Sequence, residues 1–200
     1  GNAVTALNMT DCGVIVVNGQ YGVEVGTQNF FRTANSIDKP VIFAVNKVDA
    51  DNADYDNVVA QLKDAFGPSV VPVQFPVECG PGFNSVVDVL LMKQLTWKPE
   101  GGTPTITEIA PELMDKAKEW NQALVEAAAE NDETLMDKFF DKGSLNEDEM
   151  RAGIREGLIQ RSIYPVFCVS ALKDMCVRRM MEFLGNVVPF VSDMPAPIDT

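Results

Sequence analysis

Two short polar motifs in this chain carry residue types that could bind a small ligand. The first is Asn46-Lys47-Val48-Asp49, which follows the apolar run Val41-Ile42-Phe43-Ala44-Val45. In an open parallel α/β sheet, the loops at the carboxyl ends of strands line the ligand crevice. Asp49 could accept hydrogen bonds from the ring N–H and the exocyclic amine of a guanine base. Asn46 could bond the base edge and pin the neighbouring loop, and the Lys47 stem could lie along the ring face. Alone, the tetrapeptide is more typical of an ordinary polar turn.

The second motif, Ser170-Ala171-Leu172, lies far downstream in the same local context. It follows the apolar run Ile163–Val169 and precedes a helical pattern over Asp174–Leu184. A strand followed by this motif and a helix could aim the Ala171 backbone N–H at the guanine carbonyl oxygen, while the Ser170 hydroxyl braces Asp49. Each motif alone is ambiguous, and the two together predict a guanine-binding site.

These motifs resemble the fourth and fifth nucleotide motifs of translational GTPases, and the roughly 120 residues between them resemble the inserted subdomain of the bacterial elongation factor G family. The segment Leu7–Val17 is similar to the helix and strand that follow the second switch in that family. Further matches in the family's order and spacing are Gly22-Val23-Glu24, Thr27, Arg32, Ala34, Phe83, Val86-Val87-Asp88, Met92, Trp97, Leu145, Glu147 and Glu149. The resemblance implies a GTP- and GDP-binding GTPase whose full chain promotes translocation of tRNA and mRNA on the ribosome.

Four positions depart from the family pattern. The family usually has Met at Val48, Arg at Ala50, Gly at Val169 and an aromatic residue at Leu172. A diverged paralogue or a ribosome-protection factor with a weakened GTPase cycle, acting mainly as an interaction module, is therefore the alternative to a translocase. An unrelated flavodoxin-like signalling domain would fit the alternation of strands and helices but would leave the two motifs unexplained.

The sequence lacks the motifs with which the family binds phosphate and magnesium. The sequence contains no Gly-x-x-x-x-Gly-Lys-Ser/Thr phosphate loop, no Asp-x-x-Gly after a strand, and no histidine. The family carries its phosphate loop, both switches, its magnesium ligands and a water-orienting histidine upstream of the residues that match Leu7-Asn8. We therefore expect an inactive fragment of a GTP hydrolase, with no catalytic residue and no metal site of its own.

The expected fold is α/β: a partial P-loop GTPase with a three-layer parallel sheet that lacks its phosphate-loop half. Residues 1–66 and 161–188 are predicted to form the partial GTP-binding domain, 67–160 an inserted α+β subdomain, and 189–200 a linker. The predicted strands and helices are Val14–Val17, Glu24–Ser36, Val41–Val45, Tyr55–Phe66, strand character over Val70–Glu78 and Val86–Trp97, three helices with apolar stripes up to Gln160, Ile163–Val169 and Asp174–Leu184. Asn146 and Glu149 have the spacing of a reciprocal cap for the third of those helices.

The charge of the chain limits its partners. The net charge is −13, and residues 100–160 hold fifteen acidic and six basic side chains. Such a surface argues against binding to nucleic acid, because cation release from phosphates drives that association. The family resemblance implies instead a contact of the insertion with the ribosomal stalk protein.

Compartment and self-association can also be predicted. No apolar run approaches ~18 residues, and four dispersed cysteines suit a reducing compartment, so we expect a cytoplasmic protein without a membrane contact. If the strand that pairs with Val14–Val17 in the family is absent, this apolar edge could form a homodimer.

Overall fold

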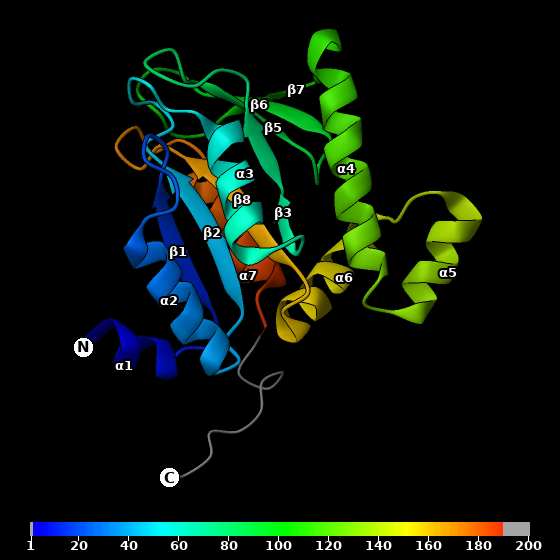
Figure 1. The fold of residues 1–200 in the computed structure, drawn as a ribbon. Helices are drawn as coiled ribbons and strands as arrows, with labels where there is room; N and C mark the ends of the chain where they lie inside the picture. The colour runs from blue at the N-terminus through cyan, green and yellow to red at the C-terminus, as the bar shows by residue number, and fades with distance from the viewer. Residues whose placement is uncertain (1, 190–200) are drawn as a thin grey trace.

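The computed structural model describes residues 2–189 and arranges them around two β-sheets (Figure 1). The first sheet is parallel, and its strands lie in the order β1 (Gly13–Asn18), β2 (Val41–Asn46), β8 (Tyr164–Val169) and β3 (Val70–Pro72). The two central strands, β2 and β8, are buried almost throughout, which explains their continuous apolar sequences. The predicted α/β class with a parallel sheet is confirmed.

Helices cover both faces of the parallel sheet. Figure 1 shows α2 and α3 on the near face and α7 on the far face. The helices associated with this sheet are α1 (Asn2–Asn8), α2 (Val25–Ser36), α3 (Tyr55–Phe66) and α7 (Val177–Val187). Helix α3 begins where the Asp54 side chain accepts a hydrogen bond from the Asn57 amide at 3.0 Å. Its end at Gly67 has φ +90°, a conformation that glycine adopts without steric strain.

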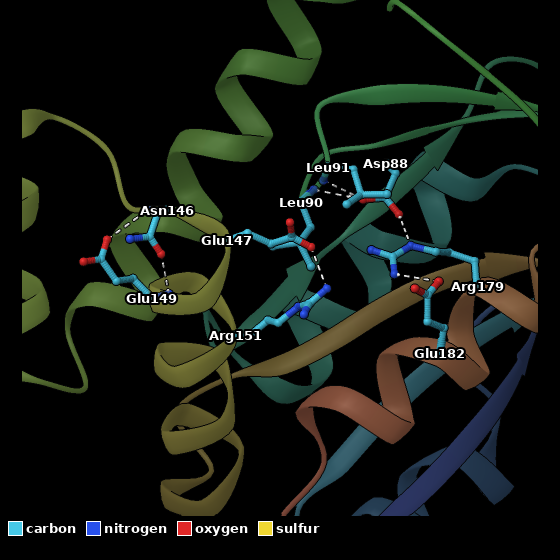
Figure 2. A network of polar contacts seen from close by, with 9 residues as sticks. All are labelled: Asp88, Leu90, Leu91, Asn146, Glu147, Glu149, Arg151, Arg179 and Glu182. Carbon is cyan, nitrogen blue, oxygen red and sulfur yellow. Dashed lines mark hydrogen bonds and ion pairs between the residues drawn. The ribbon is translucent and has the colours of Figure 1, made fainter.

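The second sheet is antiparallel and precedes a group of helices. Its strands are β4 (Gln74–Pro76), β5 (Ser85–Asp88), β6 (Lys93–Thr96) and β7 (Thr105–Thr107), in that spatial order. A short 3-10 turn, Pro111–Leu113, leads into α4 (Met114–Ala129), α5 (Glu133–Lys142) and α6 (Glu147–Gln160). The predicted cap of α6 is confirmed: Asn146 and Glu149 exchange hydrogen bonds of 2.9 Å (Figure 2).

Val73 joins the two sheets. It is the single residue between β3 and β4, its amide donates to the Val166 carbonyl of β8 at 3.0 Å, and its carbonyl accepts from the Val89 amide at 3.1 Å. The predicted division at residues 67 and 160 stays a prediction. Within that range, β3 pairs with β8 and is a member of the parallel sheet.

An aromatic cluster fills the space between the parallel sheet and its near-face helices. The Phe31 and Phe66 rings lie 4.1 Å apart between centroids, and Tyr164 meets Phe31 edge-on at 5.1 Å. Phe43 of β2 stacks on Phe66 at 5.3 Å. These rings hold α2 and α3 against the central strands.

Several predicted elements are confirmed and three need correction. The helix over Tyr55–Phe66 has the predicted bounds. The last helix begins at Val177 rather than Asp174, because Asp174 and Cys176 have φ of +51° and +63°, which a right-handed helix excludes. The stretches Val70–Glu78 and Val86–Trp97 are not continuous: each contains two strands, and the second is interrupted by a turn that includes Met92 at φ +51°.

The remaining predictions about the fold concern a membrane span, the cysteines and the linker. None of their helices is both long enough and apolar enough to span a membrane. Cys168 and Cys176 are buried, Cys12 and Cys79 are half-buried, and all four are free thiols. Apart from Pro189, the predicted linker lies outside the described residues.

Candidate functional site

The first candidate loop, Asn46–Asp49, leaves the carboxyl end of the central strand β2. Asn46 is in register with Asn18 of β1 and with Val169 of β8. Because the three strands run parallel, the loops that follow them emerge at one edge of the sheet. The Gly19 amide donates to the Asn46 carbonyl at 2.8 Å, so the loop after β1 lies directly against the first candidate loop.

Val48 anchors this loop and sets the direction of its neighbours. Its side chain is fully buried, and its carbonyl accepts from the Gly80 amide at 2.8 Å. Lys47 has φ +63°, and its carbonyl accepts from the Ala50 amide at 3.0 Å, which closes a tight turn. The turn leaves Lys47 exposed and Asp49 mostly shielded, with 13% of its side chain accessible.

The second candidate loop, Ser170–Cys176, joins β8 to α7. Ser170 and Met175 exchange two backbone hydrogen bonds of 3.1 and 3.0 Å, which close the loop into a compact turn. Left-handed residues at Asp174 and Cys176 complete it. Ala171 and Leu172 project from the turn, and Leu172 is 94% exposed.

The two loops are joined by a direct hydrogen bond. The Ala171 backbone N–H donates to Asn46 Oδ1 at 3.0 Å, although the residues are 125 positions apart in the sequence. Lys173 Nζ lies 4.0 Å from Asp49 Oδ2 and donates to the Pro81 carbonyl at 3.3 Å. The resulting surface combines an amide, a carboxylate and an ammonium group on two adjacent loops.

Comparison with known protein families assigns the chain to one of them. The model of the elongation factor Tu GTP binding domain matches residues 1–190. The chain belongs to this family of translational GTPase domains. A crystal structure of a protein from Thermus thermophilus is similar to the chain with a TM-score of 0.84 and 24% sequence identity. The similarity covers 94% of this chain and 28% of that one. The chain therefore spans less than a third of the solved structure's length, and at this identity the likeness supports the fold alone.

For this elongation factor Tu-type domain, the structure brings together the residues that sequence reasoning selected. Asn46, Lys47 and Asp49 share one turn, and Ser170, Ala171 and Leu172 share the adjacent one. Their role in binding guanine stays a prediction. Among the described residues, no cluster of histidine, cysteine, aspartate and glutamate side chains has the arrangement of a metal site.

The Ala171 N–H, which the sequence predicted to face the guanine carbonyl oxygen, donates instead to Asn46 Oδ1. A second predicted contact is wrong. The Ser170 hydroxyl does not hydrogen-bond to Asp49 among the described residues. It accepts instead from the Lys173 amide at 3.4 Å, because the backbone bonds to Met175 hold the fully buried Ser170 side chain inside its own turn. The cation nearest to the Asp49 carboxylate is Lys173, which the sequence interpretation missed. Lys173 directly follows the Ser170-Ala171-Leu172 motif in the sequence, and this position was the signal that could have identified it.

A buried ion pair lies beneath the second loop. Arg179 Nε donates to Asp88 Oδ2 at 2.8 Å, and the two side chains are only 8% and 2% accessible (Figure 2). Burial by itself disfavours the charged guanidinium, but attraction to Asp88 and Glu182 outweighs it and raises the pKa of Arg179 above its usual value. The Arg179 guanidinium therefore keeps its charge although it is buried.

A hollow of about 630 Å³ lies away from the two loops, along β1. It is lined by α1, β1 and α2, mostly with apolar side chains that include Leu7, Val14 and Phe30. Val14 and Val16 of β1 are 40% and 62% exposed. Within the described residues β1 forms a ladder with β2 alone, apart from a single bridge between Asn18 and Gly22, so most of its other edge is open.

Proposed function

We propose that the loops Asn46–Asp49 and Ser170–Cys176 form the base-binding part of a guanine-nucleotide site. The observation that carries this proposal is the 3.0 Å bond from the Ala171 amide to Asn46 Oδ1, which joins the two loops directly. Asp49 accepts from the ring N–H and the amine of guanine, two donors that adenine does not present together. The exposed Lys47 stem covers the ring face.

The expected affinity of this chain for the base is low. Charge-assisted hydrogen bonds to Asp49 contribute roughly 1.5–3 kcal/mol each, while association costs on the order of 4–15 kcal/mol in lost ligand freedom. Little surplus remains, so we expect an affinity no better than about 1 mM, which corresponds to roughly −4 kcal/mol. Millimolar nucleoside is therefore the concentration at which to measure binding.

A titration of the isotope-labelled chain with guanosine, followed by amide chemical shifts, tests the proposal. We expect guanosine, but not adenosine, to shift resonances of Asn46–Asp49 and Ala171–Lys173, and Asp49→Ala to abolish the response. The matched control is Asp51→Ala, which removes an exposed carboxylate two residues downstream. Equal shifts with adenosine, or a response that survives in Asp49→Ala, would refute base recognition by Asp49.

For the whole protein, we propose a GTP-dependent translation factor of the elongation factor G type, of which this chain is a part. The family match and the 28% share of the Thermus chain support the proposal. Phosphate binding, magnesium and hydrolysis then belong to the longer chain, and the cytoplasm is its compartment. The test is ribosome-stimulated GTP hydrolysis and tRNA movement by the full-length protein. Binding to ribosomes without stimulated hydrolysis would favour an interaction factor instead.

The antiparallel sheet with helices α4–α6 is proposed to contact the ribosomal stalk protein. Fifteen acidic side chains in residues 100–160 suit a transient contact that is steered by charge. We expect amide shifts in α4–α6 when stalk protein is added, and a binding constant that weakens as salt rises. Shifts that are absent at low salt would contradict this contact.

The open edge of β1 is proposed as a homodimer contact of this chain. Val14 and Val16 are exposed on an apolar strand without a charged residue, and an unpaired edge of this kind pairs readily with another chain. Val16→Lys is expected to shift a concentration-dependent dimer to monomer in analytical ultracentrifugation. A wild-type chain that stays monomeric at high concentration would contradict the proposal.

A further inference from the structure

Asp88 at the end of β5 lies at the centre of a buried polar network in the antiparallel sheet. One carboxylate oxygen accepts from the Leu90 and Leu91 amides at 3.1 and 3.0 Å. The other accepts from Gln74 Nε2 at 3.1 Å and from Arg179 Nε at 2.8 Å (Figure 2). Four donors therefore hold one carboxylate in a fixed position inside the protein.

Arg179 connects this network to the second candidate loop. It is the third residue of α7, which begins directly after the Ser170–Cys176 turn. Its Nη1 donates to Glu182 on the same helix at 3.3 Å, so the guanidinium is held from both sides. A single side chain thus links the antiparallel sheet to the helix that follows the loop carrying Ala171.

The chemistry of the Asp88–Arg179 contact indicates that it positions α7 rather than stabilises the fold. A buried ion pair contributes little net stability, because desolvation of both charges offsets their attraction, and an apolar pair of similar volume serves as well. An apolar pair does not fix the orientation of two segments, because its contacts have no preferred direction. Three donors of the antiparallel sheet hold the Asp88 carboxylate in place. The directional bond from Arg179 then sets the distance and orientation of α7 relative to β5, whereas apolar side chains slide more freely against each other.

The turn between β8 and α7 is short and held by several hydrogen bonds, so the turn moves together with the start of the helix. Ser170 and Met175 are joined by two backbone bonds, and the left-handed φ of Asp174 and Cys176 leaves little freedom between Met175 and the first turn of α7. A shift of the start of α7 therefore moves Ala171 relative to Asn46.

We propose that Arg179 is a positioning residue for guanine recognition. Clamped by Asp88, it holds α7 and the Ser170–Cys176 turn so that the Ala171 amide stays on Asn46 and the guanine-binding surface is formed before the ligand arrives. The antiparallel sheet thereby supports the base site through one buried contact. This inference rests on the proposed guanine binding.

The experiment measures guanosine affinity and hydrogen exchange of the Ala171 amide in Arg179→Gln, compared with wild type. We expect affinity for guanosine to fall by about 2- to 30-fold, the range of couplings carried through packed networks, and exchange at Ala171 to accelerate. The control is Arg151→Gln, which breaks an exposed pair with Glu147 on α6 (Figure 2) and should change neither value. Arg179→Lys keeps the charge and should restore part of the affinity.

A double variant, Asp88→Asn with Arg179→Gln, tests whether the pair acts as a unit. We expect it to weaken guanosine binding no more than the worse single variant. If Arg179→Gln does not fold, the comparison of Arg179→Lys with Asp88→Asn replaces it. Unchanged Ala171 exchange and unchanged affinity in folded variants would overturn the positioning role while leaving guanine binding intact. Wild type that does not respond to guanosine would overturn the proposed function, and the positioning role with it.

Discussion

Among the described residues, Asn46 Oδ1 is the only side-chain atom that accepts a hydrogen bond from the Ala171 amide. Replacing Asn46 by alanine removes this acceptor. The bond is 3.0 Å long and lies between the loops after β2 and β8. A hydrogen bond of this kind contributes about 0.5–1.5 kcal/mol net, and water reaches the exposed Ala171 once the acceptor is gone. We therefore expect the free energy of unfolding to fall by about 1 kcal/mol, near the middle of that range.

Urea denaturation and amide exchange measure this effect. With a denaturant slope of about 1–3 kcal/mol per molar urea, the midpoint should fall by roughly 0.3–1 M. Exchange of the Ala171 amide should accelerate about fivefold, the factor that corresponds to 1 kcal/mol. The matched control is Asn29→Ala on the exposed side of α2, whose side chain makes no hydrogen bond among the described residues. An unchanged midpoint and unchanged Ala171 exchange in Asn46→Ala would refute the claim that Asn46 joins the loops.

Further predictions concern packing and pH. Gly153→Ala should destabilise the protein by about 1–3 kcal/mol in urea unfolding, because a Cβ there would lie 2.5 Å from the Ala128 carbonyl oxygen of α4. Gly185→Ala in α7, where a Cβ meets nothing within 4 Å, should instead stabilise it by about 0.5–1 kcal/mol, and a loss of stability there would contradict the packing. Burial, partly offset by a backbone hydrogen bond at Gly13, raises the pKa of the Cys12 thiol from 9.0 to about 12. Since the folded state then keeps a proton that the unfolded chain loses, stability should fall above about pH 9 by up to roughly 1.4 kcal/mol per pH unit. The slope should diminish in Cys12→Ala, and an unchanged slope would show that other groups cause it.

Local sequence was sufficient for much of the fold. The run Val41–Val45 is apolar at every position because both faces of β2 are covered, and this pattern identified a central strand. Tyr55–Phe66 could be bounded because Asp54 and Gly67 are a typical start and stop for a helix. The apolar stripe of α5 was less informative: Phe140 belongs to it by spacing, yet its side chain is 76% exposed.

Local sequence patterns did not predict the contacts between segments that are distant in the chain. The stretch Val70–Glu78 has uniform strand character, but Val73 divides it by hydrogen-bonding to Val166 of β8 and to Val89, the residue after β5. That role depends on partners far along the chain. At the site, residue types indicated which loops would meet, whereas backbone pairing decided that Ser170 turns away from Asp49. Asp88 and Arg179 are 91 residues apart, and each alone has the sequence signature of an ordinary surface charge.

The central claim is that Asp49 reads the guanine base, and a change of base preference tests it most directly. Asp49→Asn replaces one acceptor oxygen by an N–H₂ donor, which matches xanthine, whose second carbonyl stands where guanine has its amine. Amide-shift titrations of wild type and Asp49→Asn with guanosine and xanthosine should show guanosine preferred by the first and xanthosine by the second. If both proteins respond equally to both nucleosides, Asp49 does not contact the base edge and the account is wrong.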